Sequence, residues 1–107
     1  FGITPSAMAT APIATQAKIP EVVMAAGTSS ITEASPFVVR TSFTLAQSSV
    51  PMAEWSAKNG IKKVYMITSD YAPGYDAENF FKKEFEKLGG EIIGSARSPI
   101  TETNFGV

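Results

Sequence analysis

Residues 62–68, Lys-Lys-Val-Tyr-Met-Ile-Thr, decide the fold class of this chain. The apolar run at their centre, Val64–Ile67, is typical of a parallel strand that is covered on both faces. The next seven residues, Ser-Asp-Tyr-Ala-Pro-Gly-Tyr (69–75), combine Pro, Gly and Asp and therefore predict a turn.

A helix and a second strand follow this turn. Residues 76–88 have the spacing of an amphipathic helix. Its apolar face consists of Ala77, Phe80, Phe81, Phe85 and Leu88. Gly89 and Gly90 end the helix, and Glu-Ile-Ile-Gly-Ser-Ala (91–96) predicts the next strand. A strand–helix–strand unit of this length has a right-handed connection and parallel strands.

The preceding residues alternate in the same way. An Ala-rich helix is predicted over residues 6–18, with Ser6 as its N-cap and with Pro12 kinking or breaking it. Short strands are predicted over residues 21–25 and 37–41.

Between those strands, residues 27–36 predict a loop with a single helical turn. A further helix is predicted over residues 45–59. Pro51 is awkward in its interior unless the helix effectively starts near Ser48 or Ser49, which would put Pro51 in the first turn. This alternation predicts an α/β fold.

The composition excludes several classes of function. The chain has 107 residues, a net charge of −1, and no Cys or His. Zinc sites with Cys or His ligands, thiol nucleophiles and Ser-His-Asp triads are therefore excluded. The sequence has no Lys/Arg cluster of the kind that binds nucleic acid, and nothing in it calls for a cofactor.

The two ends of the sequence suggest an internal piece of a longer protein. Phe-Gly-Ile (1–3) resembles the tail of a strand, and Thr-Asn-Phe-Gly-Val (103–107) the start of a helix. Because strand edges and apolar faces meant for absent neighbours would be exposed, we expect residues 1–107 by themselves to self-associate.

The carboxyl ends of the predicted strands are the candidate binding site, because ligands of open parallel sheets sit there. Three loops lie at such ends, and they contain small, hydroxyl or aromatic residues: 3–6, 25–29 and 69–75. Loops of this kind that lead into helices hold carboxylates and other small anions. The alternative for Ser6 is a capping role alone, and Tyr71 and Tyr75 could simply cover the sheet end.

Asp70 offers a different hypothesis, because an Asp at a strand end is the phosphoacceptor of receiver domains. Such a site needs an acidic pair at a neighbouring strand end. The neighbouring positions here are Thr4 and Ala25, which weighs against it.

The order of the segments resembles the periplasmic solute-binding proteins of branched-chain amino-acid ABC transporters, the Leu/Ile/Val-binding type. The segments that carry the resemblance are Gly2-x-x-x-Ser6, Ile19-Pro20, Ala26-Gly27-Thr28-Ser29, Phe37-x-x-Arg40-Thr41, Lys62-Lys63-Val64-Tyr65, Asp70-Tyr71-Ala72-x-Gly74, Gly89-Gly90 and Thr103-Asn104-Phe105. The resemblance covers essentially the whole chain. No single motif is specific, but their order and spacing together are.

The resemblance implies a type 1 periplasmic binding fold, with two Rossmann-like parallel-sheet lobes that close on a solute. Residues 1–43 would be the end of lobe one and the first crossover, and residues 44–107 the start of lobe two. It also implies a periplasmic location, an ABC permease in the membrane as partner, and no enzymatic activity.

The resemblance further implies roles for individual residues. Ser6, Ala26 and Thr28 would hold the solute's carboxylate and amino group, and Gly27 would let the backbone approach. From lobe two, the turn that contains Tyr71 and Pro73 would close over the solute. Many relatives carry an aromatic residue at the position of Pro73. That contact is therefore lost or passes to Tyr71, and the solute stays open between amino acids, aromatic acids, amides and urea.

Two alternatives to a transport protein remain. The same scaffold could belong to an α/β hydrolase or to the ligand-sensing regulator of an amidase-type system, since fold does not fix function. The absence of His and Cys weighs against the enzyme.

Overall fold

A computed structural model describes residues 1–106. The chain divides into two compact units, Phe1–Leu45 and Ala46–Val107, and each is described here by itself. The assignment of residues 1–43 and 44–107 to two lobes stays a prediction.

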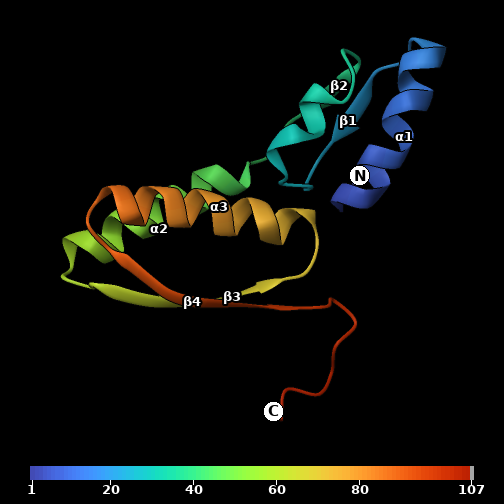
Figure 1. The fold of residues 1–107 in the computed structure, drawn as a ribbon. Coiled ribbons are helices and arrows are strands. Elements are labelled where there is room, and N and C mark those ends of the chain that lie inside the picture. The colour runs from blue at the N-terminus through green and yellow to red at the C-terminus, as the bar shows by residue number, and fades with distance from the viewer. Residues whose placement is uncertain (107) are drawn as a thin grey trace. The chain divides into compact units, whose positions relative to one another are not determined.

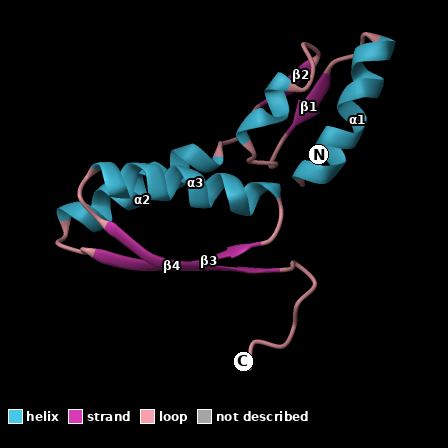
Figure 2. Ribbon diagram, viewed as in Figure 1, coloured by secondary structure: helices cyan, strands magenta, loops and turns pink. Residues whose placement is uncertain are grey.

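The first unit pairs two short strands beside a helix (Figures 1 and 2). Helix α1 (Thr4–Ala17) precedes strand β1 (Glu21–Val23), and the 3-10 helix η1 (Ser29–Glu33) precedes strand β2 (Val38–Arg40). The two strands are parallel, with Glu21 opposite Val38 and Val23 opposite Arg40. Both predicted strands and the single helical turn between them are confirmed, although each strand is two residues shorter than predicted.

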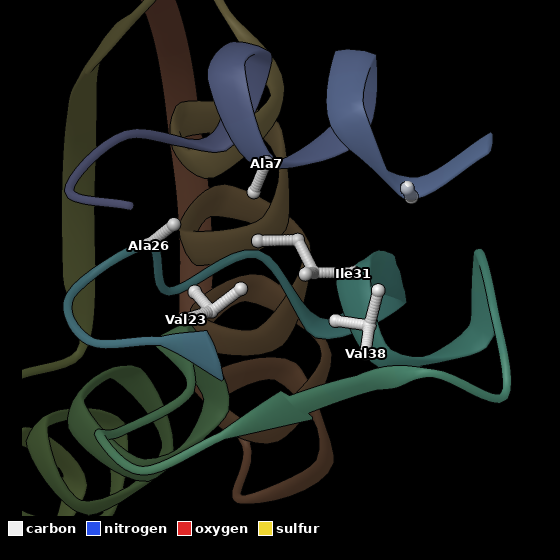
Figure 3. Close-up of a cluster of buried hydrophobic side chains, with 6 residues drawn as sticks. Ala7, Val23, Ala26, Ile31 and Val38 are labelled. Carbon is white, nitrogen blue, oxygen red and sulfur yellow. The ribbon is translucent and has the colours of Figure 1, made fainter. Parts of the chain in front are cut away.

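The core of the first unit is built from small and β-branched side chains (Figure 3). It contains Ala7, Ala11, Val23, Ala26, Ile31 and Val38. The two alanines of α1 leave room for the helix to lie close to β1 and η1. The position of η1 therefore depends on Ile31, which is fully buried.

Helix α1 begins two residues earlier than predicted. Its N-cap is Ile3, which makes no side-chain capping bond, and Pro5 occupies the first turn. Proline is favoured there because its missing N–H has no partner within the helix. The prediction of Ser6 as N-cap is therefore wrong. The predicted break at Pro12 is also wrong, since the helix continues to Ala17 while Pro12 is exposed.

The second unit contains the predicted strand–helix–strand arrangement. It comprises α2 (Leu45–Lys58), β3 (Lys63–Ser69), α3 (Ala72–Lys87) and β4 (Glu91–Ser98). Strands β3 and β4 are parallel, with Ser69 opposite Ser98 at their carboxyl ends. Helix α3 packs on both strands (Figure 1). The α/β prediction is confirmed.

Helix α2 confirms the helix predicted over residues 45–59, but not the later start that was expected because of Pro51. It starts at Leu45, whose backbone N–H donates to the carbonyl oxygen of Gly27 at 2.9 Å. This bond anchors the first residue of the helix, so Pro51 lies in the interior rather than in the first turn. The expected start near Ser48 or Ser49 is wrong.

Helix α3 includes residues 72–75, which were predicted to belong to the turn 69–75. It starts at Ala72, four residues earlier than predicted, with Pro73 in its first turn and Tyr71 as N-cap. A Cβ on Gly74 would overlap the backbone of Ser69, so the glycine lets α3 start directly beside the end of β3. The predicted helical start at residues 103–107 is wrong for 103–106, which form no helix, and residue 107 lies outside the described residues.

The β3–β4 pair is covered on one face. Met66 points toward the covered face and is buried, while Tyr65, Ile67 and Ile93 are 55%, 76% and 55% exposed. The prediction that this strand is covered on both faces is therefore wrong for residues 1–106. No helix within the described part of the chain is long and apolar enough to cross a membrane.

Candidate functional site

The loop that follows β1 presents backbone rather than side chains. The methyl group of Ala26 lies in the core with Ala7, Val23 and Ile31 (Figure 3), so only the backbone of Ala26 can face a solute. A Cβ on Gly27 would overlap the end of the Leu45 side chain and lie in tight contact with the ring of Phe43. Without a side chain at Gly27, Phe43 and Leu45 pack close to the backbone of the loop.

Thr28 shares a buried hydrogen bond with the first residue of α1. The hydroxyl oxygens of Thr4 and Thr28 lie 2.9 Å apart, and the two residues are only 3% and 6% exposed. Either hydroxyl can be the donor. When Thr4 donates, the hydroxyl proton of Thr28 is left to donate to an anion.

Arg40, the last residue of β2, binds the same loop from the other strand. Its Nη1 donates to the carbonyl oxygen of Thr28 at 2.6 Å and to that of Ala26 at 3.4 Å. Because the carbonyl of Gly27 accepts from Leu45, all three consecutive carbonyls accept hydrogen bonds from within the unit.

Ser6 lies in the first turn of α1 and is half-buried. Its carbonyl accepts from the hydroxyl of Thr10 at 3.0 Å. The N-terminus of α1 receives no side-chain cap, and N–H groups at such an end favour a negative charge. An anion-binding role for this turn is thus compatible with the geometry, whereas the capping alternative for Ser6 is not.

In the second unit, Tyr71 and Pro73 lie where β3 passes into α3. Tyr71 has extended backbone, with φ −159° and ψ 173°, and its N–H donates to the carbonyl of Ser69 at 2.9 Å. Both residues are half-buried. Pro73 has no N–H, so it cannot donate to a solute.

A chain of polar contacts links Asp70 to the first turns of α3. The hydroxyl of Tyr75 donates to Asp70 Oδ1 at 2.6 Å, and the guanidinium of Arg97 lies 4.6 Å from the centre of the Tyr75 ring. The hydrogen bond to Asp70 raises the pKa of Tyr75 above its ordinary value. Tyr75 therefore fixes the carboxylate of Asp70 instead of merely covering the sheet end.

Arg97 extends this chain to a buried carboxylate. Its Nε donates to Glu78 Oε2 at 2.9 Å, and this bond holds the pKa of Glu78 below its ordinary value although burial acts in the opposite direction. No group of three His, Cys, Asp or Glu side chains that could hold a metal ion occurs among residues 1–106.

Of the predicted site residues, the structure brings Ala26, Gly27 and Thr28 together in one loop of the first unit and places Tyr71 and Pro73 together in the second. Sequence reasoning missed Thr4 and Arg40. Thr4 carried a signal, since it directly follows the expected strand tail and precedes Pro5. Arg40 belongs to the segment Phe37-x-x-Arg40-Thr41, which carried the family resemblance but assigned no role to its side chain.

The family model for periplasmic binding proteins matches residues 1–107. The chain belongs to this family. It is 50% identical over 105 residues to Leu/Ile/Val-binding protein homolog 6 of Brucella abortus. The aligned region covers 98% of this chain and 27% of that protein. The chain thus spans about a quarter of the length of this curated relative.

Solved structures agree with this family. One is a solute-binding protein of an ABC transporter from Rhodopseudomonas palustris BisB5, solved in complex with 3,4-dihydroxybenzoic acid. It is 64% identical to this chain, and the two structures superpose with a TM-score of 0.94. The match covers 98% of this chain and 29% of that one. One from Rhodopseudomonas palustris HaA2, in complex with p-hydroxybenzoic acid, is 52% identical with a TM-score of 0.96, over 99% and 29%.

A leucine-binding protein from Thermotoga maritima is 30% identical with a TM-score of 0.84, over 98% of this chain and 30% of that one. Residues 1–106 therefore have the fold of the corresponding portion, about 30% of the length, of type 1 periplasmic binding proteins.

Proposed function

We propose that this chain is part of the extracytoplasmic solute-binding component of an ABC transporter, which captures a small carboxylate-bearing solute. The observation that carries the proposal is the loop Ala26–Thr28, in which bare backbone and the Thr28 hydroxyl, supported by Thr4, are presented beside the uncapped N-terminus of α1. Such a concentration of donors suits a carboxylate.

In this proposal the roles of the residues differ. Thr28 and Ser6 donate from their hydroxyls, and Ala26 and Gly27 contribute backbone. Tyr71 supplies the second unit's polar contact, while Pro73 contributes only apolar surface because it has no donor. Binding energy comes from donors that are already in place, and closure of the two lobes on the solute signals occupancy to the permease.

The solute class follows from the relatives. Two similar solute-binding proteins were crystallised with hydroxybenzoic acids, and the Thermotoga maritima relative is a leucine-binding protein. We therefore propose a branched-chain amino acid or an aromatic acid as solute. The partner is an ABC permease in the membrane, and the location is periplasmic.

A binding role is favoured over the enzyme and regulator alternatives. The chain has no His or Cys to act as a general base or thiol nucleophile, and its family consists of binding proteins. The polar groups of the loop after β1 are donors suited to hold an anion rather than to attack a carbonyl.

A thermal-shift screen of the full-length protein tests the proposal. The panel contains leucine, isoleucine, valine, benzoate, 4-hydroxybenzoate, 3,4-dihydroxybenzoate, a small amide and urea. A solute that binds only the native state raises the melting temperature, and we expect a shift with one carboxylate class. A folded protein that shifts with none of them would contradict the proposal.

Residues 1–107 by themselves are proposed to self-associate through the uncovered face of the β3–β4 pair. Tyr65, Ile67 and Ile93 are exposed there, and apolar sheet faces of this kind drive association. Light scattering of the isolated segment checks this. We expect a mass above that of a monomer, reduced by Ile67→Lys; a monodisperse monomer would refute the proposal.

A further inference from the structure

The carboxylate of Glu21 is buried without a partner. Glu21 is the first residue of β1 and is only 5% exposed. Neither Oε1 nor Oε2 has a hydrogen-bond partner within the part of the chain that the structure describes. Burying a carboxylate is costly unless a cation or several hydrogen-bond donors replace the water that it loses. Glu21 therefore requires a partner that residues 1–106 do not supply.

The nearest candidate partners in the first unit are engaged elsewhere. The unit contains two cationic side chains, Lys18 and Arg40. Arg40 donates to carbonyls of the loop Ala26–Thr28, beyond the opposite end of β1. Lys18, the C-cap of α1, is exposed. The hydroxyl of Thr10 donates to carbonyls of its own helix.

Glu21 lines a cavity of about 290 Å³ between α1 and the start of β1. The other walls of the cavity are mainly apolar and include Phe1, Ile13, Ala14, Ala17 and Ile19. Ile13 and Ile19 are 63% and 60% exposed, so these walls have room for a further apolar group. A carboxylate among apolar walls suits a side chain with a long aliphatic stem and a cationic head, which is the chemistry of lysine and arginine.

Phe1 indicates which part of the full-length protein reaches this cavity. Its amino nitrogen donates to the carbonyl of Val22 at 3.4 Å, and its carbonyl accepts from the N–H of Met24 at 3.2 Å. Bonds of this kind on either side of Val23 are the pattern of parallel strands. A residue joined to the amino nitrogen of Phe1 would therefore continue beside β1 toward Glu21.

We propose that Glu21 forms a buried ion pair with a lysine or arginine of the segment that precedes Phe1 in the full-length protein. The pair holds that segment against the start of β1, and the aliphatic stem of the cation fills the cavity. Glu21 lies at the amino end of β1, whereas the loop Ala26–Thr28 follows its carboxyl end. The inference is therefore independent of the solute and of the proposed function.

Thermal unfolding of the full-length protein tests the pair through the sign of the change. Glu21→Gln keeps the shape of the side chain and removes its charge. When a cation faces Glu21, the variant leaves that cation buried and unpaired, so we expect the melting temperature to fall by several degrees. When none does, the variant removes an unpaired buried charge. A melting temperature that stays or rises would overturn the proposal. Glu33→Gln, at an exposed glutamate of η1, is the control for net charge.

Lys18→Met tests for a local partner. Lys18 lies three residues before Glu21, and its side chain could turn toward the carboxylate in solution. We expect the melting temperature of the full-length Lys18→Met variant to stay close to that of the wild-type protein. A fall equal to that of Glu21→Gln would make Lys18 the partner and would overturn the proposed one.

A crystal structure of the full-length protein identifies the partner, and it decides even when Glu21→Gln does not fold. We expect an ammonium or guanidinium nitrogen of the segment before Phe1 within about 4 Å of the Glu21 carboxylate. A carboxylate that faces only water or apolar side chains, or that pairs with a cation from elsewhere, overturns the inference. None of these measurements involves the solute, so their failure leaves the proposed function standing.

Discussion

The hydroxyl oxygens of Thr4 and Thr28 lie 2.9 Å apart in the interior of the first unit, although 23 residues separate them in the sequence. The bond joins the start of α1 to the loop after β1, the two places from which donors are expected to reach the solute's carboxylate. A chain of two hydroxyls polarises the outer one, so Thr4 strengthens the donor that Thr28 offers.

Thr4→Val is therefore expected to weaken solute binding, although Thr4 is not expected to contact the solute and acts only through Thr28. A neutral hydrogen bond is worth about 1 kcal/mol, which corresponds to roughly fivefold in affinity. Isothermal titration of the full-length variant measures this loss. Thr10→Val is the control, since Thr10 lies on the same helix and its hydroxyl donates only to the carbonyls of Ser6 and Ala7. Equal affinities in the two variants would contradict the proposed relay.

Thr28→Val is expected to be more harmful than Thr4→Val. It removes the donor itself and leaves a buried partner unsatisfied, so about 1–3 kcal/mol of binding free energy should be lost. The measurement is the dissociation constant of the full-length variant for the solute found in the screen. Retained affinity in a variant whose melting temperature matches the wild type would remove Thr28 from the site.

Tyr71→Phe tests the contribution of the second unit. If the hydroxyl of Tyr71 donates to the solute, its removal should cost about 1 kcal/mol of binding free energy and leave the fold intact. Tyr65→Phe is the matched control, because Tyr65 is 55% exposed on the uncovered face of the β3–β4 pair. The role fails if both variants bind as the wild type does.

Gly74→Ala is expected to destabilise the second unit. The added Cβ would overlap the backbone of Ser69, which cannot move without disturbing the junction of β3 and α3. Overpacking of this kind costs about 1–3 kcal/mol. Thermal unfolding compares this variant with Gly2→Ala, whose Cβ meets no atom within 4 Å. Similar melting temperatures would show that the junction can relax.

The sequence was sufficient for most of the fold because the patterns are local. The run Val64–Ile67 and the aromatic face of the following helix each follow from spacing, and Phe85 is indeed fully buried. Element starts were less predictable. Those of α2 and α3 depend on the bond from Leu45 to Gly27 and on the fit of Gly74 against Ser69, which join residues that short-range patterns do not connect.

The candidate site was predictable only in part, for the same reason. The loop Ala26–Thr28 stands out because small residues follow an apolar strand. Arg40 does not, since its role depends on the parallel pairing that sets Val23 opposite Arg40 and brings the guanidinium to the carbonyls of the preceding loop. Such a role becomes visible only after the strands have been placed.

Stability should depend on pH through Glu78. Arg97 donates to its carboxylate at 2.9 Å and, with a weaker bond from Thr68, lowers the pKa of Glu78 from its ordinary value of 4.5. The unfolded chain then binds more protons than the native one between the lowered value and 4.5, so stability rises with pH across that window. The contribution is complete above about 4.5 and is lost as the pH falls through the lowered native pKa.

Glu78→Gln isolates this contribution, because the variant has no carboxylate to titrate. We expect the difference in unfolding free energy between the wild-type protein and the variant to be largest at neutral pH and to shrink as the pH falls below 4.5. Urea unfolding of the full-length protein at a series of pH values measures it. Arg97→Met should reduce the same difference, since it removes the donor that lowers the pKa. A difference that stays constant from neutral pH down to acid conditions would mean that the pair of Glu78 and Arg97 does not couple protonation to folding.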